Sequence, residues 1–219
     1  VSTAESVKPL WANVPDTISP EWGVFFSEKG QGREKPMPAP DDLEAWKAVQ
    51  AAIDEVKEAK ADEKAAAFGV IYEESEIAGI PVVEVTPSEL ASTEKIAVYT
   101  HGGAYVLNSA KAVIESAMFF AAETGLRVIA VDYTLAPHSK WQETTDEIVD
   151  VFRALAKRGF TADNIVLYGD SAGGGLAAAV TLKMRDLGMR MPAALVLWSP
   201  WADISETGDT YVTLRDAEP

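Results

Sequence analysis

The feature that most constrains the fold is a series of short apolar runs that alternate with helix-like segments. Strands are predicted at 80–85, 95–100, 127–133, 164–168 and 193–198. Helices are predicted between the later strands at 109–124, 143–158 and 172–187, each followed by a glycine. The later strands are continuously apolar, which is typical of parallel sheets buried on both faces. The sequence therefore predicts an α/β fold with a mostly parallel central sheet and helices on both faces.

The first 67 residues differ in character from the rest. Residues 1–40 are rich in proline but carry several aromatic side chains, which argues against a disordered tail. Residues 41–67 begin after a capping aspartate, Asp41 or Asp42, and carry apolar side chains at three- and four-residue spacing. This pattern predicts an amphipathic covering helix. We therefore expect an N-terminal segment of residues 1–67 and a second part of residues 68–219.

Composition excludes several classes of protein. The net charge of −15, from 34 acidic and 19 basic residues, disfavours nucleic acids and anionic membranes as partners. The absence of cysteine excludes disulfides, thiolate metal sites and cysteine nucleophiles. No run approaches the ~20 apolar residues needed to span a bilayer. Residues 1–11 also lack the basic start and apolar stretch of a signal peptide, so a cytoplasmic location is expected.

A Gly-x-Ser-x-Gly sequence occupies residues 169–173, directly between a predicted strand and a predicted helix. Small residues on both sides permit a sharp, strained turn that presents Ser171 at its tip, beside a helix N-terminus that favours negative charge. The alternative is a glycine-rich turn that binds phosphate. That alternative is disfavoured because this segment matches neither of the phosphate-binding patterns, Gly-x-Gly-x-x-Gly and Gly-x-x-x-x-Gly-Lys-Ser/Thr. Ser171 is therefore the candidate nucleophile.

His101, Gly102 and Gly103 follow another predicted strand. A serine nucleophile generates a negatively charged tetrahedral oxygen, and glycine N–H groups can approach that oxygen closely. Gly102 and Gly103, together with Ala172 after the serine, are the candidate oxyanion donors. We expect His101 to hold this loop by hydrogen bonds rather than to act as the catalytic base.

Two further turns end neighbouring strands. Residues 132–137, Asp-Tyr-Thr-Leu-Ala-Pro, and residues 198–203, Trp-Ser-Pro-Trp-Ala-Asp, each resemble an ordinary turn when taken alone. In the order HGGAY, DYTLAP, GDSAGG and SPWAD, however, the four segments resemble the hormone-sensitive-lipase-like esterases of the α/β-hydrolase fold. The resemblance covers roughly residues 80–203.

This resemblance implies a carboxylic ester hydrolase for short- to medium-chain acyl esters that uses no cofactor and no metal. It implies Ser171 as the nucleophile, His101, Asp132 and Asp170 as supports of the site, and a cap built partly from the N-terminal region. His138 and Gln142 stand where the family usually has Glu and Pro, which we interpret as local differences in a supporting loop. Candidate pocket residues are Tyr105, Trp198, Trp201, Phe25 and Phe26.

The sequence lacks the partners that a serine nucleophile needs. In this fold an acid and then a histidine follow the serine, but His101 and His138 both precede Ser171. Asp203, Asp209 and Asp216 follow the serine, but they come too early for the family's acid. We therefore expect the chain to be incomplete at its C-terminus, with the triad Asp and His supplied by the remaining part of the same hydrolase.

Two alternatives to this expectation stay open, and a third is disfavoured. The chain could be a non-catalytic relative that binds small molecules without a triad, or an enzyme with an unusual base such as His138. A Rossmann nucleotide-binding domain is disfavoured by its missing glycine fingerprint. The apolar last strand, 193–198, would form an exposed edge, which predicts that this chain does not fold stably alone.

The oligomeric state also stays open. A homodimer is one alternative, because similar esterases include dimers.

Overall fold

The computed structural model describes residues 19–20, 37–205 and 207–213. Residues 38–202 form one compact unit, and residues 1–37 and 203–219 are grouped in another. The described part of the second unit includes the short helix α7 (Thr210–Thr213). The predicted boundary at residue 67 lies within the first unit, and the division at that residue stays a prediction. Two of the candidate pocket residues, Phe25 and Phe26, lie outside the described residues.

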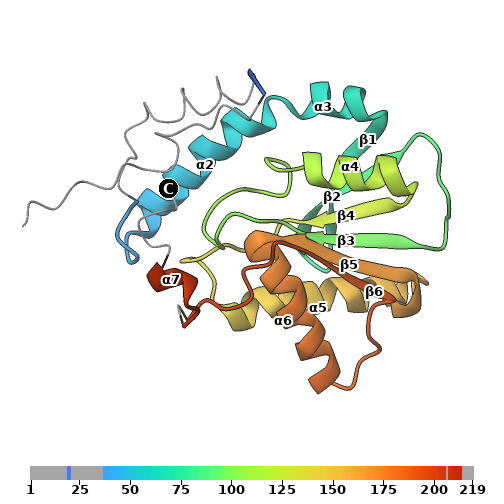
Figure 1. The fold of residues 1–219 in the computed structure, drawn as a ribbon. Helices are drawn as coiled ribbons and strands as arrows, with labels where there is room; N and C mark the ends of the chain where they lie inside the picture. The colour runs from blue at the N-terminus through green and yellow to red at the C-terminus, as the bar shows by residue number, and fades with distance from the viewer. Residues whose placement is uncertain (1–18, 21–36, 206, 214–219) are drawn as a thin grey trace, which may run out of the picture. The chain divides into compact units, whose positions relative to one another are not determined.

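A six-stranded mixed sheet forms the centre of the first unit (Figure 1), and its order is β1-β2-β4-β3-β5-β6. The strands are β1 (Val70–Ile77), β2 (Ile80–Pro87), β3 (Ile96–Thr100), β4 (Arg127–Val131), β5 (Ile165–Asp170) and β6 (Ala194–Trp198). The four strands from β4 to β6 in this order are parallel, whereas β1 and β2 pair antiparallel. The predicted mostly parallel sheet is confirmed.

Strand β1 was missed in the sequence analysis. It pairs with β2 along its whole length through a tight turn at Ala78 and Gly79, whose φ angles are 58° and 82°. The two ends of β1 are buried but most of its middle is exposed and acidic. Its apolar alternation is therefore too weak to signal a strand, and its position is fixed by pairing with β2.

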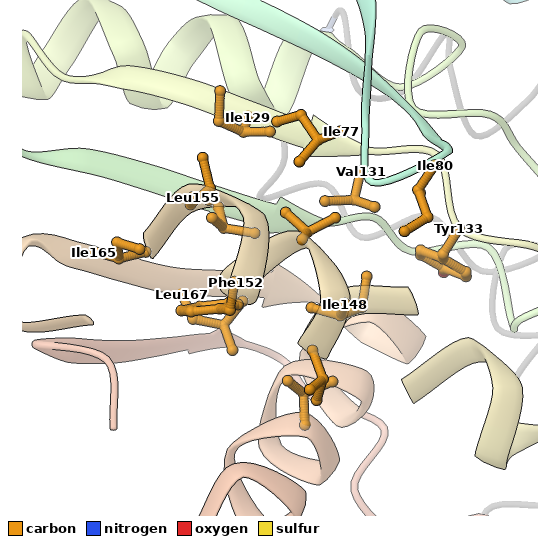
Figure 2. Close-up of a cluster of buried hydrophobic side chains, with 14 of the residues drawn as sticks. Ile77, Ile80, Ile129, Val131, Tyr133, Ile148, Phe152, Leu155, Ile165 and Leu167 are labelled. Atoms are coloured by element: carbon orange, nitrogen blue, oxygen red, sulfur yellow. The ribbon is translucent and has the colours of Figure 1, made fainter. Parts of the chain in front are cut away.

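Helices cover both faces of the sheet. On one face, α4 (Glu115–Thr124) packs over β2 and β4, and α3 (Ala61–Phe68) packs against α4 and the edge strand β1. On the other face lie α5 (Trp141–Lys157) and α6 (Ser171–Asp186). Figure 2 shows the buried apolar cluster on the α5 and α6 face, in which Ile148, Phe152 and Leu155 of α5 pack with side chains of the strands. Burial of these apolar side chains is the main favourable contribution to folding.

The predicted helices are present, with two changes of extent. The segment 41–67 forms two helices, α2 (Leu43–Glu58) and α3, and the Asp42 carboxylate caps α2 by accepting a hydrogen bond from the Ala45 N–H at 3.0 Å. Residues 110–114 form turns rather than the first part of a helix. Where these turns begin, the Asp54 and Asp132 carboxylates accept hydrogen bonds from the backbone N–H groups of Ser109 and Ala110. No helix in the described ranges is long and apolar enough to cross a membrane.

The parallel register brings the carboxyl ends of four strands, β3 to β6, to one edge of the sheet. Thr100 at the end of β3 lies opposite Val131 of β4 and Gly169 of β5. The next β5 residue, Asp170, lies opposite Trp198 of β6. The loops that carry all four sequence motifs therefore leave the sheet at the same edge, where ligands bind in open α/β sheets.

Replacement of Phe152 by alanine is expected to lower the free energy of unfolding by about 3–5 kcal/mol, because it leaves a cavity between α5 and the sheet. Phe152 is only 3% exposed. Urea unfolding followed by circular dichroism measures the change. The matched control is Arg153→Ala, the next residue on the same helix, whose half-exposed ion pair with Asp150 contributes less than about 1 kcal/mol. Equal losses in both variants would contradict the described core.

Candidate active site

Ser171 lies at a sharp turn between β5 and α6. Its φ angle is 51°, in the left-handed region that residues other than glycine rarely adopt, and the residue is exposed. A Cβ atom at Gly169 would lie 2.4 Å from the carbonyl oxygen of Gly173, and one at Gly173 would lie 2.0 Å from that of Thr100. The turn thus needs glycine at both positions, which is the physical basis of the Gly-x-Ser-x-Gly spacing.

The ends of neighbouring strands hold this turn in place. The Thr100 hydroxyl on β3 lies 2.8 Å from the Gly173 carbonyl oxygen, to which it donates a hydrogen bond. After β6, the Trp201 N–H donates to the Ser171 carbonyl oxygen at 2.8 Å. A Cβ atom at Gly175 would lie only 2.2 Å from the Trp201 carbonyl oxygen. The first turn of α6 is therefore packed between the loops that follow β3 and β6.

His101 is fully buried beside this turn. Its ring stacks on Tyr133 with 4.3 Å between the ring centroids, and its Nδ1 lies 2.9 Å from the Gly102 carbonyl oxygen. Because a carbonyl oxygen can only accept, Nδ1 carries the proton. Burial lowers the pKa of His101 to about 4, so the ring is neutral at pH 7. A neutral imidazole held in this way is suited to supporting the loop.

The Gly102 N–H has a partner that the sequence did not predict. It donates to Oδ1 of Asp170 at 3.2 Å, and the same oxygen accepts a hydrogen bond from the Tyr99 hydroxyl at 2.5 Å. In this structure the Gly102 N–H is therefore bound to a carboxylate, which argues against using it as an oxyanion donor. Asp170 instead connects the loop after β3 to the residue next to Ser171.

Gly103 begins a tight loop that only a glycine can begin. Its φ angle is 133°, and a Cβ atom there would lie 2.1 Å from the Leu107 carbonyl oxygen. Its own carbonyl oxygen accepts hydrogen bonds from the N–H groups of Val106 and Leu107 at 3.0 and 2.9 Å. Ala104 follows with a φ angle of 53°. The loop is thus a compact turn in which backbone N–H groups of Gly103 and Ala104 lie next to one another.

The turn at residues 132–137 buttresses the same loop. Asp132 accepts the Ala110 N–H at 2.7 Å, and burial raises the pKa of its carboxyl group. The Tyr133 hydroxyl donates to the His101 carbonyl oxygen at 2.6 Å, and the Ala136 N–H donates to the Tyr105 carbonyl oxygen at 2.8 Å. These contacts place Asp132 and its turn beneath the loop after β3.

The candidate pocket residues separate into two groups. Tyr105 and Trp201 lie together, with 5.9 Å between their ring centroids. Trp198 instead packs against Phe120 and Tyr168 in the core beneath α4. The structure therefore does not bring Trp198 together with the other two, because it is a strand residue whose side chain points to the α4 face.

No histidine or acid of the described residues forms a hydrogen bond with the Ser171 side chain. His138 is exposed in the turn after Pro137. Asp203 belongs to the second unit, where hydrogen bonds from Ser205 and Thr207 lower its pKa to about 2. The backbone carbonyl oxygen of Asp209 accepts a hydrogen bond from the Thr213 hydroxyl at 3.1 Å, and Asp216 lies outside the described residues. Among the described side chains, no cluster of His, Asp or Glu could hold a metal ion.

Helix α2 contributes residues that the sequence analysis did not connect with the site. Gln50 donates to the Val106 carbonyl oxygen at 2.9 Å, and Asp54 accepts the Ser109 N–H at 3.0 Å. Glu58 accepts the Ser109 hydroxyl at 2.7 Å. The available signal was the spacing of polar residues at 50, 54, 57 and 58, which places them on one face of the helix.

Comparison with known proteins agrees with this geometry. Residues 97–218 match a family described as having the alpha/beta hydrolase fold. LipR of Mycobacterium tuberculosis is 40% identical over 149 residues, which cover 68% of this chain and 48% of LipR. The esterase E25 superposes with a TM-score of 0.75 at 31% identity, covering 96% of this chain and 65% of E25. A bacterial esterase of the hormone-sensitive lipase family superposes with a TM-score of 0.70 at 27% identity, covering 91% and 63%.

The fold, the strained serine turn and the glycine loop define a hydrolase-type α/β protein. The chain belongs to the α/β-hydrolase-fold family, in its hormone-sensitive-lipase-like branch, as the sequence motifs predicted. It spans about half the length of LipR and about two thirds of the length of E25.

Replacement of Tyr99 by phenylalanine is expected to lower the free energy of unfolding by about 1.5–3 kcal/mol, because the buried hydroxyl donates to the Asp170 carboxylate. Tyr72→Phe is the matched control: its hydroxyl donates to Asp62 at 2.6 Å on the surface, where loss of the bond costs less than about 1 kcal/mol. Urea unfolding of both variants tests the difference. A loss at Tyr72 equal to that at Tyr99 would contradict it.

His101 is expected to make the protein less stable as the pH falls. Its pKa in the folded state, about 4, is below the value near 6.5 of an unfolded chain, so the unfolded state binds the proton first. From pH 7 to pH 5 this coupling removes about 2 kcal/mol of the free energy of unfolding. In a His101→Gln variant that part of the pH dependence should disappear, whereas the exposed His138→Gln should keep it. Urea unfolding at both pH values measures it, and an unchanged slope in His101→Gln would refute the buried neutral ring.

Proposed function

We propose that this chain carries the nucleophile and the oxyanion donors of a serine carboxylic ester hydrolase. The observation that carries the proposal is the position of Ser171, exposed at a left-handed turn directly beside the loop after β3. A Cβ atom at Gly102 would lie only 3.2 Å from the Ser171 Cβ, so the loop and the nucleophile are in close contact. The esterases E25 and the hormone-sensitive-lipase-family enzyme, which share this fold, support the same class of reaction.

In the proposed reaction, the Ser171 hydroxyl attacks the ester carbonyl carbon and its proton passes to a base. The tetrahedral oxygen is held by backbone N–H groups of Gly103, Ala104 and Ala172. The N–H groups in the first turn of α6 have no partner within the helix, and the helix N-terminus favours negative charge. Collapse of the intermediate expels the alcohol, which takes the proton, and leaves an acyl-enzyme at Ser171. Water then releases the acid by the same steps in reverse.

The triad Asp and His are proposed to come from a segment that this chain does not contain. Support comes from the two histidines: His101 is buried and neutral, and His138 is exposed without a hydrogen bond to Ser171 in the described structure. The edge strand β6 gives further support. Within the described residues it pairs only with β5, and Leu195 is 37% exposed. An exposed apolar edge strand can pair with further chain, and native proteins usually cover or blunt such an edge.

The substrate is proposed to be a short- to medium-chain acyl ester. Tyr105 and Trp201 form an aromatic wall on the side of the first turn of α6, and the Tyr105 hydroxyl would lie 2.7 Å from a Cβ atom at Gly175. Apolar walls of this kind suit an uncharged acyl or alcohol group. Trp198 is left out of the proposed pocket because it packs beneath α4.

A fluorophosphonate probe tests the proposed nucleophile. The natural protein, with any further chain that accompanies it, is incubated with the probe, and the mass shift is located by peptide mapping. We expect a single label at Ser171 and hydrolysis of p-nitrophenyl butyrate, both abolished by Ser171→Ala. Removing the nucleophile of a serine hydrolase typically costs about 10⁶ in kcat.

The control is Ser199→Ala, which alters a serine after β6 that has no assigned role in the chemistry. This variant should be labelled at Ser171 like the parent protein. A folded parent protein that is neither labelled nor active would overturn the proposal and favour a relative that only binds small molecules. A label at another residue would overturn the assignment of Ser171.

A further inference from the structure

The loop that faces Ser171 is held by a helix far away in the sequence. The polar face of α2, defined by Gln50, Asp54, Lys57 and Glu58, contacts residues 106–109 of the loop after β3. Three of its members bond the loop backbone or Ser109 directly. The fourth, Lys57, instead donates to the side-chain oxygen of Asn108. This contact differs from the other three because Asn108 in turn donates a hydrogen bond to the Gly102 carbonyl oxygen.

Asn108 connects Lys57 with the glycines of the loop. Its side-chain nitrogen donates to the Gly102 carbonyl oxygen at 3.0 Å, while its side-chain oxygen accepts from Lys57. Asn108 is only 9% exposed and its φ angle is 72°, a conformation that asparagine tolerates better than most residues. The bond to Lys57 fixes which end of the amide faces Gly102, because ammonium can only donate.

The Gly102 carbonyl and the Gly103 N–H belong to the same planar peptide group. In a trans peptide these two groups point in opposite directions, so fixing one fixes the other. His101 Nδ1 and Asn108 Nδ2 both donate to the Gly102 oxygen, at 2.9 and 3.0 Å. The orientation of the Gly103 N–H is therefore determined by these two side chains.

We propose that Asn108, held by Lys57 of α2, is a positioning residue that aims the Gly103 N–H at the oxyanion of the reaction. This inference rests on the proposed function, because it assigns a role within the same site. Close packing supports it: a Cβ atom at Gly103 would lie 2.7 Å from Asn108 Nδ2, so the amide lies directly against the peptide that it orients. Helix α2 thereby becomes part of the apparatus that sets the geometry of the oxyanion loop.

The test compares variants of Lys57 and Asn108 in the natural protein with any accompanying chain. Asn108→Gly keeps a residue that accepts a positive φ angle but removes the amide. We expect the maximal rate of Ser171 labelling by a fluorophosphonate, and kcat for p-nitrophenyl butyrate, to fall about tenfold, less than the ~10²–10³ expected when a donor is lost outright. The half-saturating probe concentration and KM should stay the same, because the bond acts on the transition state.

Lys57 and its neighbour supply the matched controls. Lys57→Met should reduce the maximal rate severalfold and have little further effect in the Asn108→Gly background, whereas Lys57→Arg retains a donor and should restore most of the rate. Lys60→Met removes an exposed lysine one turn away and should leave the rate unchanged. In an NMR spectrum, the ¹⁵N resonance of the Gly103 amide should move in Asn108→Gly and Lys57→Met but not in Lys60→Met.

The outcomes separate the two proposals. A parent protein that is labelled at Ser171, with equal maximal rates for parent and Asn108→Gly, overturns the positioning role and leaves the proposed function standing. A fall in rate together with an unchanged Gly103 resonance also overturns it, since the loop would then not have moved. A folded parent protein that is not labelled overturns the proposed function, and the role of Asn108 in it falls as well.

Discussion

The close approach of the carboxyl end of β3 to the first turn of α6 is the constraint on which the rest of the site depends. At Gly173 there is no room even for a methyl group, because the carbonyl oxygens of Thr100 and His101 would lie 2.0 and 2.4 Å from it. The parallel pairing of Thr100 with Gly169 sets this distance. It forces Ser171 into a left-handed conformation and at the same time brings the glycine loop beside it. Nucleophile and loop are thus positioned by one packing contact in the sheet.

Around this contact, the loop after β3 is fixed by hydrogen bonds from three directions. Asp170 binds the Gly102 N–H, His101 and Asn108 bind the Gly102 carbonyl oxygen, and Tyr133 binds the His101 carbonyl oxygen. A loop rich in glycine has high conformational entropy when it is free, so its order has to come from such partners. Preorganised donors stabilise a transition state most because they need not reorganise during the reaction. This is the physical reason to connect a rigid glycine loop with catalysis of acyl transfer.

The sequence predicted those parts of this arrangement that depend on residues close together in the chain. Gly169, Ser171 and Gly173 define the turn because the chain itself must pass through a narrow space there, and the neighbouring strands are recognisable as apolar runs. The partner of the Gly102 N–H was not predictable in the same way. It depends on Asp170, 68 residues away in the sequence, and on the hydroxyl of Tyr99 that holds it. The packing of Trp198 against Phe120 and Tyr168 was not predictable for a related reason, since the face to which a strand residue points is decided by register.

The surroundings of His101 show why the acid–base part of the proposed reaction requires another group. A general base works best when its pKa lies near the working pH. Burial lowers the pKa of His101 to about 4, and its protonated nitrogen already donates to the Gly102 carbonyl oxygen. Giving the ring a proton from Ser171 would create a cation in a fully buried position, where desolvation of the charge outweighs the attraction of Asp170. The same burial that makes His101 a good support of the loop makes it a poor proton acceptor, so this site separates the task of shaping the oxyanion loop from the task of activating the serine.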